Sequence, residues 1–135
     1  MLSLRTFVGT ITLSEKFVYL KKKHEVVLAE EVDLYNLDLY KDYVPVPHIE
    51  KKDIIQAFFD HYHLNKEKQM FCESEDLVAD FNNYIHDYSH CMLGFTMYEL
   101  YWDFQDAYLK PIAVKWLVQN KIPYEDDLGK GIRLF

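Results

Sequence analysis

The chain has 135 residues, of which half are hydrophobic and 27% are charged, a composition typical of a folded globular protein and unlike a disordered segment. Twenty-two acidic residues against fifteen basic ones give a net charge of −7. Binding to nucleic-acid phosphates or to an anionic membrane surface needs clustered Lys and Arg, so this balance disfavours both. The length predicts a single domain, residues 1–135.

The cellular location is predicted from three features. No apolar run is long enough to span a membrane, and residues 1–5 do not begin as a signal peptide does. Disulfides are typical of oxidising compartments, and no secretion signal is expected here. Cys72 and Cys91 are therefore expected to be free thiols. We therefore expect a cytoplasmic protein.

The N-terminal part, residues 1–47, is expected to contain a β-hairpin. Residues 3–13 favour a helix by the spacing of their apolar side chains, or a strand by their β-branched content. The apolar runs 17–20 and 25–28 flank a basic segment and predict an antiparallel hairpin. Residues 44–47, Val-Pro-Val-Pro, must be extended because of their prolines.

Residues 30–43 are acidic and rich in Tyr, and they predict a loop or a short irregular element. The part that follows, residues 48–123, is expected to be helical. Apolar residues at helical spacing predict a first helix over 49–63, and Ser74 is expected to be the N-cap of a second, which Gly94 ends.

Thr96 and Glu99 have the spacing of a capping box, which predicts the start of a third helix. Pro111 predicts a kink or a restart in it, and Asn120 is expected to adopt the left-handed conformation at its end. The C-terminal tail, residues 124–135, is expected to pack only through Leu128, Ile132, Leu134 and Phe135. Altogether we expect an α+β domain, with an N-terminal helix or strand and a β-hairpin followed by three to four packed α-helices.

The acidic residues are not evenly spread. Residues 69–109 contain no Lys or Arg, and their acids are interleaved with Tyr and Trp. One interpretation is a solubilising face; the other is a docking surface for a basic partner, with aromatic anchors. The residues expected to bind such a partner are Glu75, Asp76, Asp80, Asp87, Glu99, Asp103, Asp106, Tyr101 and Trp102.

Candidate metal and catalytic residues are sparse. His86 and His90 are four residues apart on the expected helix, with Cys91 adjacent, but no third ligand has suitable spacing, so no metal is expected. No nucleophile, phosphate-binding or metalloprotease motif is present. We therefore expect neither enzymatic activity nor a cofactor.

The C-terminal third resembles a small bacterial protein family of uncharacterised function. The resemblance rests on the ending Ala-x-x-Trp-Leu-x-x-Asn-x-Ile at 113–122, and the Tyr-x-Pro-x-Pro segment at 43–47 and the hairpin around Tyr19 match in the same order. It implies that the first segment, residues 3–13, is helical. The family is rich in Arg in its last two helices, whereas this chain has no Arg there, and Pro111 interrupts a helix that is normally continuous.

The leading hypothesis is a non-enzymatic acidic protein that binds a protein with a basic surface, for example a phage or mobile-element inhibitor of a nucleic-acid-binding protein. The alternative is a small nucleic-acid-binding or regulatory module that uses the basic turn Lys21–Lys23 and exposed aromatic residues. Either hypothesis is compatible with a homodimer.

Overall fold

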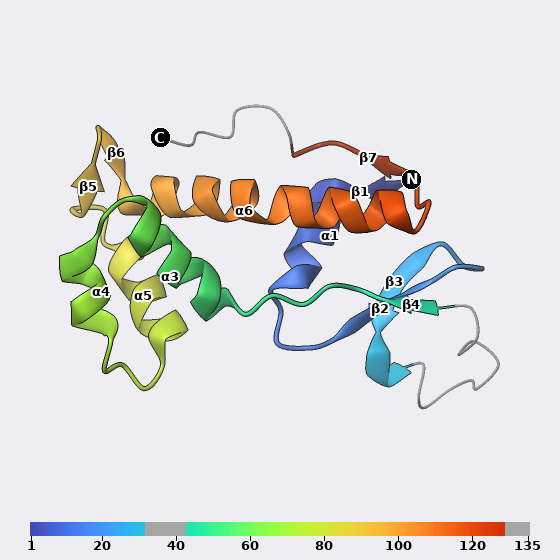
Figure 1. Ribbon diagram of the computed structural model, residues 1–135, viewed down its shortest axis with the longest axis horizontal. Helices are drawn as coiled ribbons and strands as arrows, with labels where there is room; N and C mark the ends of the chain where they lie inside the picture. Colours follow the sequence, from blue (N-terminus) through green and yellow to red (C-terminus); the bar gives the residue numbers. More distant parts are fainter. Residues whose placement is uncertain (32–42, 129–135) are drawn as a thin grey trace. The chain divides into compact units, whose positions relative to one another are not determined.

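The computed structural model describes residues 1–31 and 43–128. They form an α+β fold (Figure 1), as the sequence predicted. They group into two compact units: a first unit from 1–50 and from Leu109 onward, and a second unit, Lys51–Tyr108. Most of the segment 30–43, for which a loop or irregular element was expected, lies outside the described residues. The tail residues Ile132, Leu134 and Phe135 lie outside them as well.

The first unit begins with β1 (Leu2–Ser3) and α1 (Leu4–Ile11), so the open choice between helix and strand is settled for helix. All four apolar side chains at helical spacing are buried, which a strand would not allow on one face. The Ser3 hydroxyl accepts the Thr6 N–H, and the Asp127 carboxylate accepts from the Ser3 hydroxyl and, at 2.8 Å, from the Arg5 N–H. The start of α1 is therefore capped.

The predicted hairpin is confirmed. Strands β2 (Phe17–Leu20) and β3 (Glu25–Leu28) are antiparallel, with Phe17 opposite Leu28. The extended proline segment supplies a third strand, β4 (Tyr43–Pro45), which pairs with β2 in the order β3-β2-β4. Because β4 lies at the edge of the sheet, its proline removes no hydrogen bond from a central strand.

The chain after α6 also belongs to the first unit. Strand β7 (Tyr124–Glu125) pairs in parallel with β1, and Leu128 is only 2% exposed. The tail therefore contacts its unit through backbone pairing as well as through the predicted Leu128. Within the same unit the rings of Phe7 and Trp116 stack at 5.3 Å.

The second unit contains α3 (Lys51–His61), α4 (Asn65–Phe71), α5 (Leu77–His86), the hairpin of β5 (Cys91–Met92) and β6 (Phe95–Thr96), and the first part of α6 (Met97–Gln119). Its core is aromatic: the fully buried Phe58 makes edge contacts with Phe81, Tyr101 and Phe104, at 5.4 to 6.0 Å between ring centroids. Most of the abundant aromatic side chains of this unit are thereby used in packing.

Several predictions about the helices need correction, and one is confirmed. The second predicted helix, α5, ends at His86 and not at Gly94. The N-cap of α5 is Asp76 and not Ser74, whose hydroxyl donates to Asp80 instead. At the other end of the helical part, the left-handed residue is Lys121 (φ 58°) and not Asn120, which donates its side-chain N–H to the Trp116 carbonyl. The capping box of Thr96 and Glu99 is confirmed.

Pro111 lies inside a helix that is continuous from Met97 to Gln119, so the predicted restart at this residue is wrong. A proline removes one backbone N–H but leaves the rest of the ladder intact, and the buried Leu109, Ala113 and Leu117 hold both flanks of this position in the core of the first unit. Within the described ranges, no helix combines the length and the apolar character that a membrane span requires.

Candidate functional site

The net charge of the chain belongs to the second unit. Residues 51–108 carry eleven acidic and four basic residues, a net −7, whereas the described residues of the first unit carry eight of each. The second unit therefore has a strong negative potential, and the first is balanced. Such a field attracts basic molecules and weakens with added salt.

The predicted partner-binding acids fall into separate groups. Glu75, Asp76 and Asp80 lie at the start of α5, about 15 Å of helix away from Asp87 at its end. Asp76 accepts the Ala79 N–H as the N-cap, and Asp80 accepts the Ser74 hydroxyl. Asp76 and Asp80 are therefore used in holding the start of α5.

Asp87 follows the last residue of α5. Its carboxylate accepts both the Ser89 hydroxyl, at 2.7 Å, and the Ser89 N–H, at 3.1 Å. These two hydrogen bonds lower the pKa of the Asp87 carboxyl, with a further contribution from His90. Asp87 is thus a negative charge fixed in the turn between α5 and β5.

Glu99, Asp103 and Asp106 share one face of α6, as their spacing predicted. Glu99 also closes the capping box, since its carboxylate accepts from the Thr96 hydroxyl at 3.1 Å. Asp103 and Asp106 are partly exposed along the same face.

The two aromatic members of the predicted site differ. Tyr101 is fully buried, so its prediction as a partner-binding residue is wrong: its ring packs in the core, and its hydroxyl donates to Gln105 at 2.7 Å. Trp102 is partly exposed, and the Lys51 ammonium lies 4.5 Å from its ring centroid. The stretch without Lys or Arg therefore receives a cation from α3, and burial lowers the pKa of that ammonium.

A continuous row of aromatic rings borders these acids. Tyr98 makes edge contacts with His86 at 5.1 Å, with Tyr88 at 5.6 Å and with Trp102 at 6.1 Å. Tyr88 is 59% exposed. We call the set of Tyr88, Tyr98, Trp102, Glu99, Asp103 and Asp106 the aromatic–acidic surface. It can bury apolar side chains of a partner beside its cationic ones.

Sequence reasoning missed the hairpin that leads into this surface. Met92 pairs with Phe95, so Leu93 and Gly94 form a two-residue turn, and both have positive φ, 57° and 82°. Such turns favour Asn or Gly at the first position, yet here an exposed Leu93 (59%) occupies it. The signal available in the sequence is the apolar-x-Gly-apolar pattern at 92–95, which is compatible with a tight hairpin turn as well as with a helix end at Gly94.

The two candidate metal ligands do not share a helix, because α5 ends at His86. His86 Nδ1 is 2.6 Å from the Asn82 carbonyl, and the His90 ring stacks on Tyr84 at 3.9 Å. Within residues 1–31 and 43–128, no three His, Cys, Asp or Glu side chains gather as a metal site would require.

The basic turn of the alternative hypothesis lies in the first unit, between β2 and β3, with Lys21 and Lys23 exposed. The aromatic–acidic surface belongs wholly to the second unit. No protein-family model, curated protein or solved structure matches this chain. The family resemblance of residues 43–47 and 113–122 therefore stays a prediction.

Proposed function

We propose that this chain is a non-enzymatic binding protein whose aromatic–acidic surface docks onto a protein with a basic surface. The local concentration of negative charge would accelerate the encounter, and the exposed rings would supply the apolar contacts that hold the complex. Where the partner uses its basic surface to bind nucleic acid, this docking makes the chain an inhibitor, of the kind that phages and mobile elements carry.

The observation that carries the proposal is Leu93. Residues other than Gly, Asn, Asp or His rarely adopt a left-handed conformation, and a leucine there gains nothing from burial when it is exposed. A left-handed backbone at an exposed leucine motivates the hypothesis that Leu93 contacts a partner. The unit that contains Leu93 carries a net charge of −7, which selects a basic partner.

The test uses the partner captured by the wild-type chain from its native cells, with the dissociation constant then measured at low and high salt. Asp103→Asn with Asp106→Asn is expected to weaken binding about tenfold at low salt, mainly through the association rate, because rim charges act on encounter. Leu93→Asn is expected to weaken it about tenfold through the dissociation rate, as loss of an apolar anchor does. Nucleic acid bound to the partner should be displaced by the wild-type chain.

The matched control is Glu30→Gln with Glu31→Gln, which changes the net charge equally at two exposed acids of the first unit. This control should bind like the wild type. Equal loss of affinity in both double variants would mean that net charge alone acts, and unchanged affinity in all variants would exclude the aromatic–acidic surface as the docking site.

A further inference from the structure

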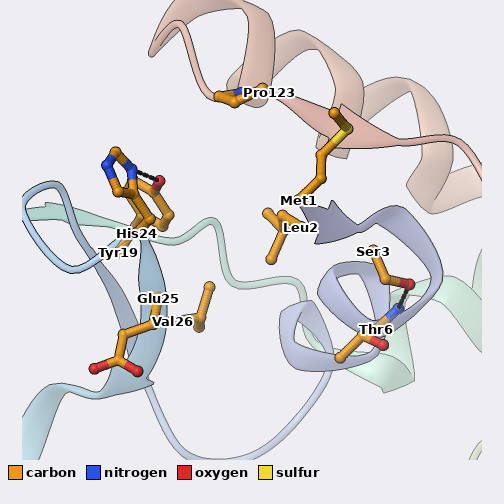
Figure 2. Close-up of a pocket in the computed structure, with 9 residues that line it drawn as sticks. All are labelled: Met1, Leu2, Ser3, Thr6, Tyr19, His24, Glu25, Val26 and Pro123. Carbon is orange, nitrogen blue, oxygen red and sulfur yellow. Dashed lines mark hydrogen bonds between the residues drawn. The ribbon is translucent and has the colours of Figure 1, made fainter.

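A second site lies in the first unit, independent of the docking proposal. A cavity of about 660 Å³ opens there between β1, the start of α1, the β2–β3 hairpin and the segment before β7 (Figure 2). This volume is within the range of small-molecule pockets. Its apolar lining comes from Met1, Leu2, Val26 and Pro123.

One wall of the cavity is polar. The Tyr19 hydroxyl and His24 Nδ1 are 3.2 Å apart, and Figure 2 shows the two rings together at one side of the space. Burial raises the pKa of the Tyr19 hydroxyl, so it keeps its proton at neutral pH. Whichever of the two groups donates to the other, the pair retains one N–H or O–H to offer to a ligand.

The backbone of His24 is also unusual. It has φ 53° at the end of the turn between β2 and β3, and its ring lies against Tyr19. Two other polar side chains that line the cavity, Ser3 and Glu25, are already used or turned away. The Ser3 hydroxyl pairs with Asp127 and Thr6, and in Figure 2 the Glu25 carboxylate points away from the space. Tyr19 and His24 remain as the hydrogen-bonded polar pair of this wall.

The local charge indicates the sign of the ligand. His24 completes a turn whose preceding residues are all lysines, Lys21–Lys23, and Lys21 and Lys23 are exposed. This is the densest group of cations in the sequence, in the unit that lacks the negative excess. Lysines next to an apolar cavity with a hydrogen-bond donor suit an anion that carries an apolar chain.

We propose that this cavity binds a small monocarboxylate with an apolar chain, with the chain against Leu2, Val26 and Pro123 and the carboxylate at the Tyr19–His24 pair. Sodium decanoate is the probe, titrated at low millimolar concentration into the full chain and followed through backbone amide NMR signals. Saturable shifts are expected at Leu2, Thr6, His24 and Val26. Decyltrimethylammonium, which has the same chain and the opposite charge, should not produce them.

The test variants are His24→Asn, since Asn tolerates the left-handed backbone, and Tyr19→Phe, which keeps the ring. Each is expected to weaken decanoate binding about tenfold, the loss typical of one hydrogen bond to a charged group. His63→Asn is the matched control, because His63 is an exposed left-handed histidine (φ 55°) of the second unit, and it should bind like the wild type. The proposal is overturned if decanoate gives no saturable shifts, if the cationic probe binds equally, or if both test variants keep wild-type affinity.

Discussion

At the scale of single residues, the aromatic core of the second unit contains one buried polar pair. Tyr101 is fully buried, Gln105 is 7% exposed, and the hydroxyl of the first donates to the side-chain oxygen of the second. Burial strongly raises the pKa of the Tyr101 hydroxyl. The unfolded chain would ionise this group near pH 10, whereas the folded chain keeps it protonated, so the contribution of Tyr101 to stability is complete below about pH 10 and is lost as the pH rises further.

Tyr101→Phe therefore has a pH-dependent effect on the free energy of unfolding. Near pH 8 the variant should be about 1 kcal/mol less stable than the wild type, since Gln105 loses its buried donor. Above about pH 10 the wild type should lose about 1.4 kcal/mol of stability for each further pH unit, because Tyr101 ionises only in the unfolded chain. The phenylalanine cannot ionise, so the difference between the two proteins should shrink and then reverse. Urea unfolding between pH 8 and 11 measures both effects.

The control for this experiment is Tyr88→Phe, the same substitution on a side chain that is 59% exposed. It should change the free energy of unfolding by less than about 0.5 kcal/mol throughout. A difference between wild type and Tyr101→Phe that stays constant with pH would mean that the Tyr101 hydroxyl is not held protonated by the fold.

At the scale of elements, the turn of the β5–β6 hairpin has a residue type that conflicts with its backbone geometry. Leu93→Asn places in the turn a residue that favours positive φ and precedes Gly94, as type I′ turns prefer. The variant should be more stable than the wild type by about 0.5 to 1 kcal/mol, although it is expected to bind its partner less well. Urea unfolding at neutral pH measures the gain.

Leu13→Asn serves as the control for the hairpin, because Leu13 is a comparably exposed leucine (45%) without positive φ. It should bring no such gain in stability. A loss of stability in Leu93→Asn would show that Leu93 packs within its own chain, and it would remove the main support for a docking role.

The elements also show how far the sequence could predict this fold. The β2–β3 hairpin, the helices around Phe58 and Phe81 and the capping box at Thr96 follow from local periodicity and spacing, which lie within a few residues. The pairing of β4 with β2 and of β7 with β1 depends on contacts between distant parts of the chain, so no local sequence pattern predicts it.

The errors at helix ends and at the site have related causes. Ser74 and Asp76 are both good N-caps, and only packing decides between them; Pro111 is tolerated because buried neighbours hold the helix. The acidic face of α6 could be predicted from spacing alone. The burial of Tyr101 and the approach of Lys51 to Trp102 could not, since both depend on how α3 packs against α6 within the second unit.

At the scale of the whole molecule, the uneven distribution of charge affects stability. The negative excess is confined to residues 51–108, where Glu99, Asp103 and Asp106 repel one another along α6 by a few tenths of a kcal/mol per pair. Salt screens such repulsion over about 10 Å at 0.1 M. The first unit, with equal numbers of acidic and basic residues among those described, has no net charge of this kind.

The melting temperature should therefore rise with sodium chloride between about 20 and 300 mM, because screening removes a penalty of the folded state. Asp103→Asn with Asp106→Asn removes two of the eleven acidic residues of the second unit, and its melting temperature should rise less with added salt. Glu30→Gln with Glu31→Gln, which changes the net charge equally in the first unit, should keep the wild-type dependence. Calorimetry of the three proteins across this range measures the slopes. Identical slopes in both double variants would place the repulsion in the chain as a whole, and then the aromatic–acidic surface would have no special electrostatic role.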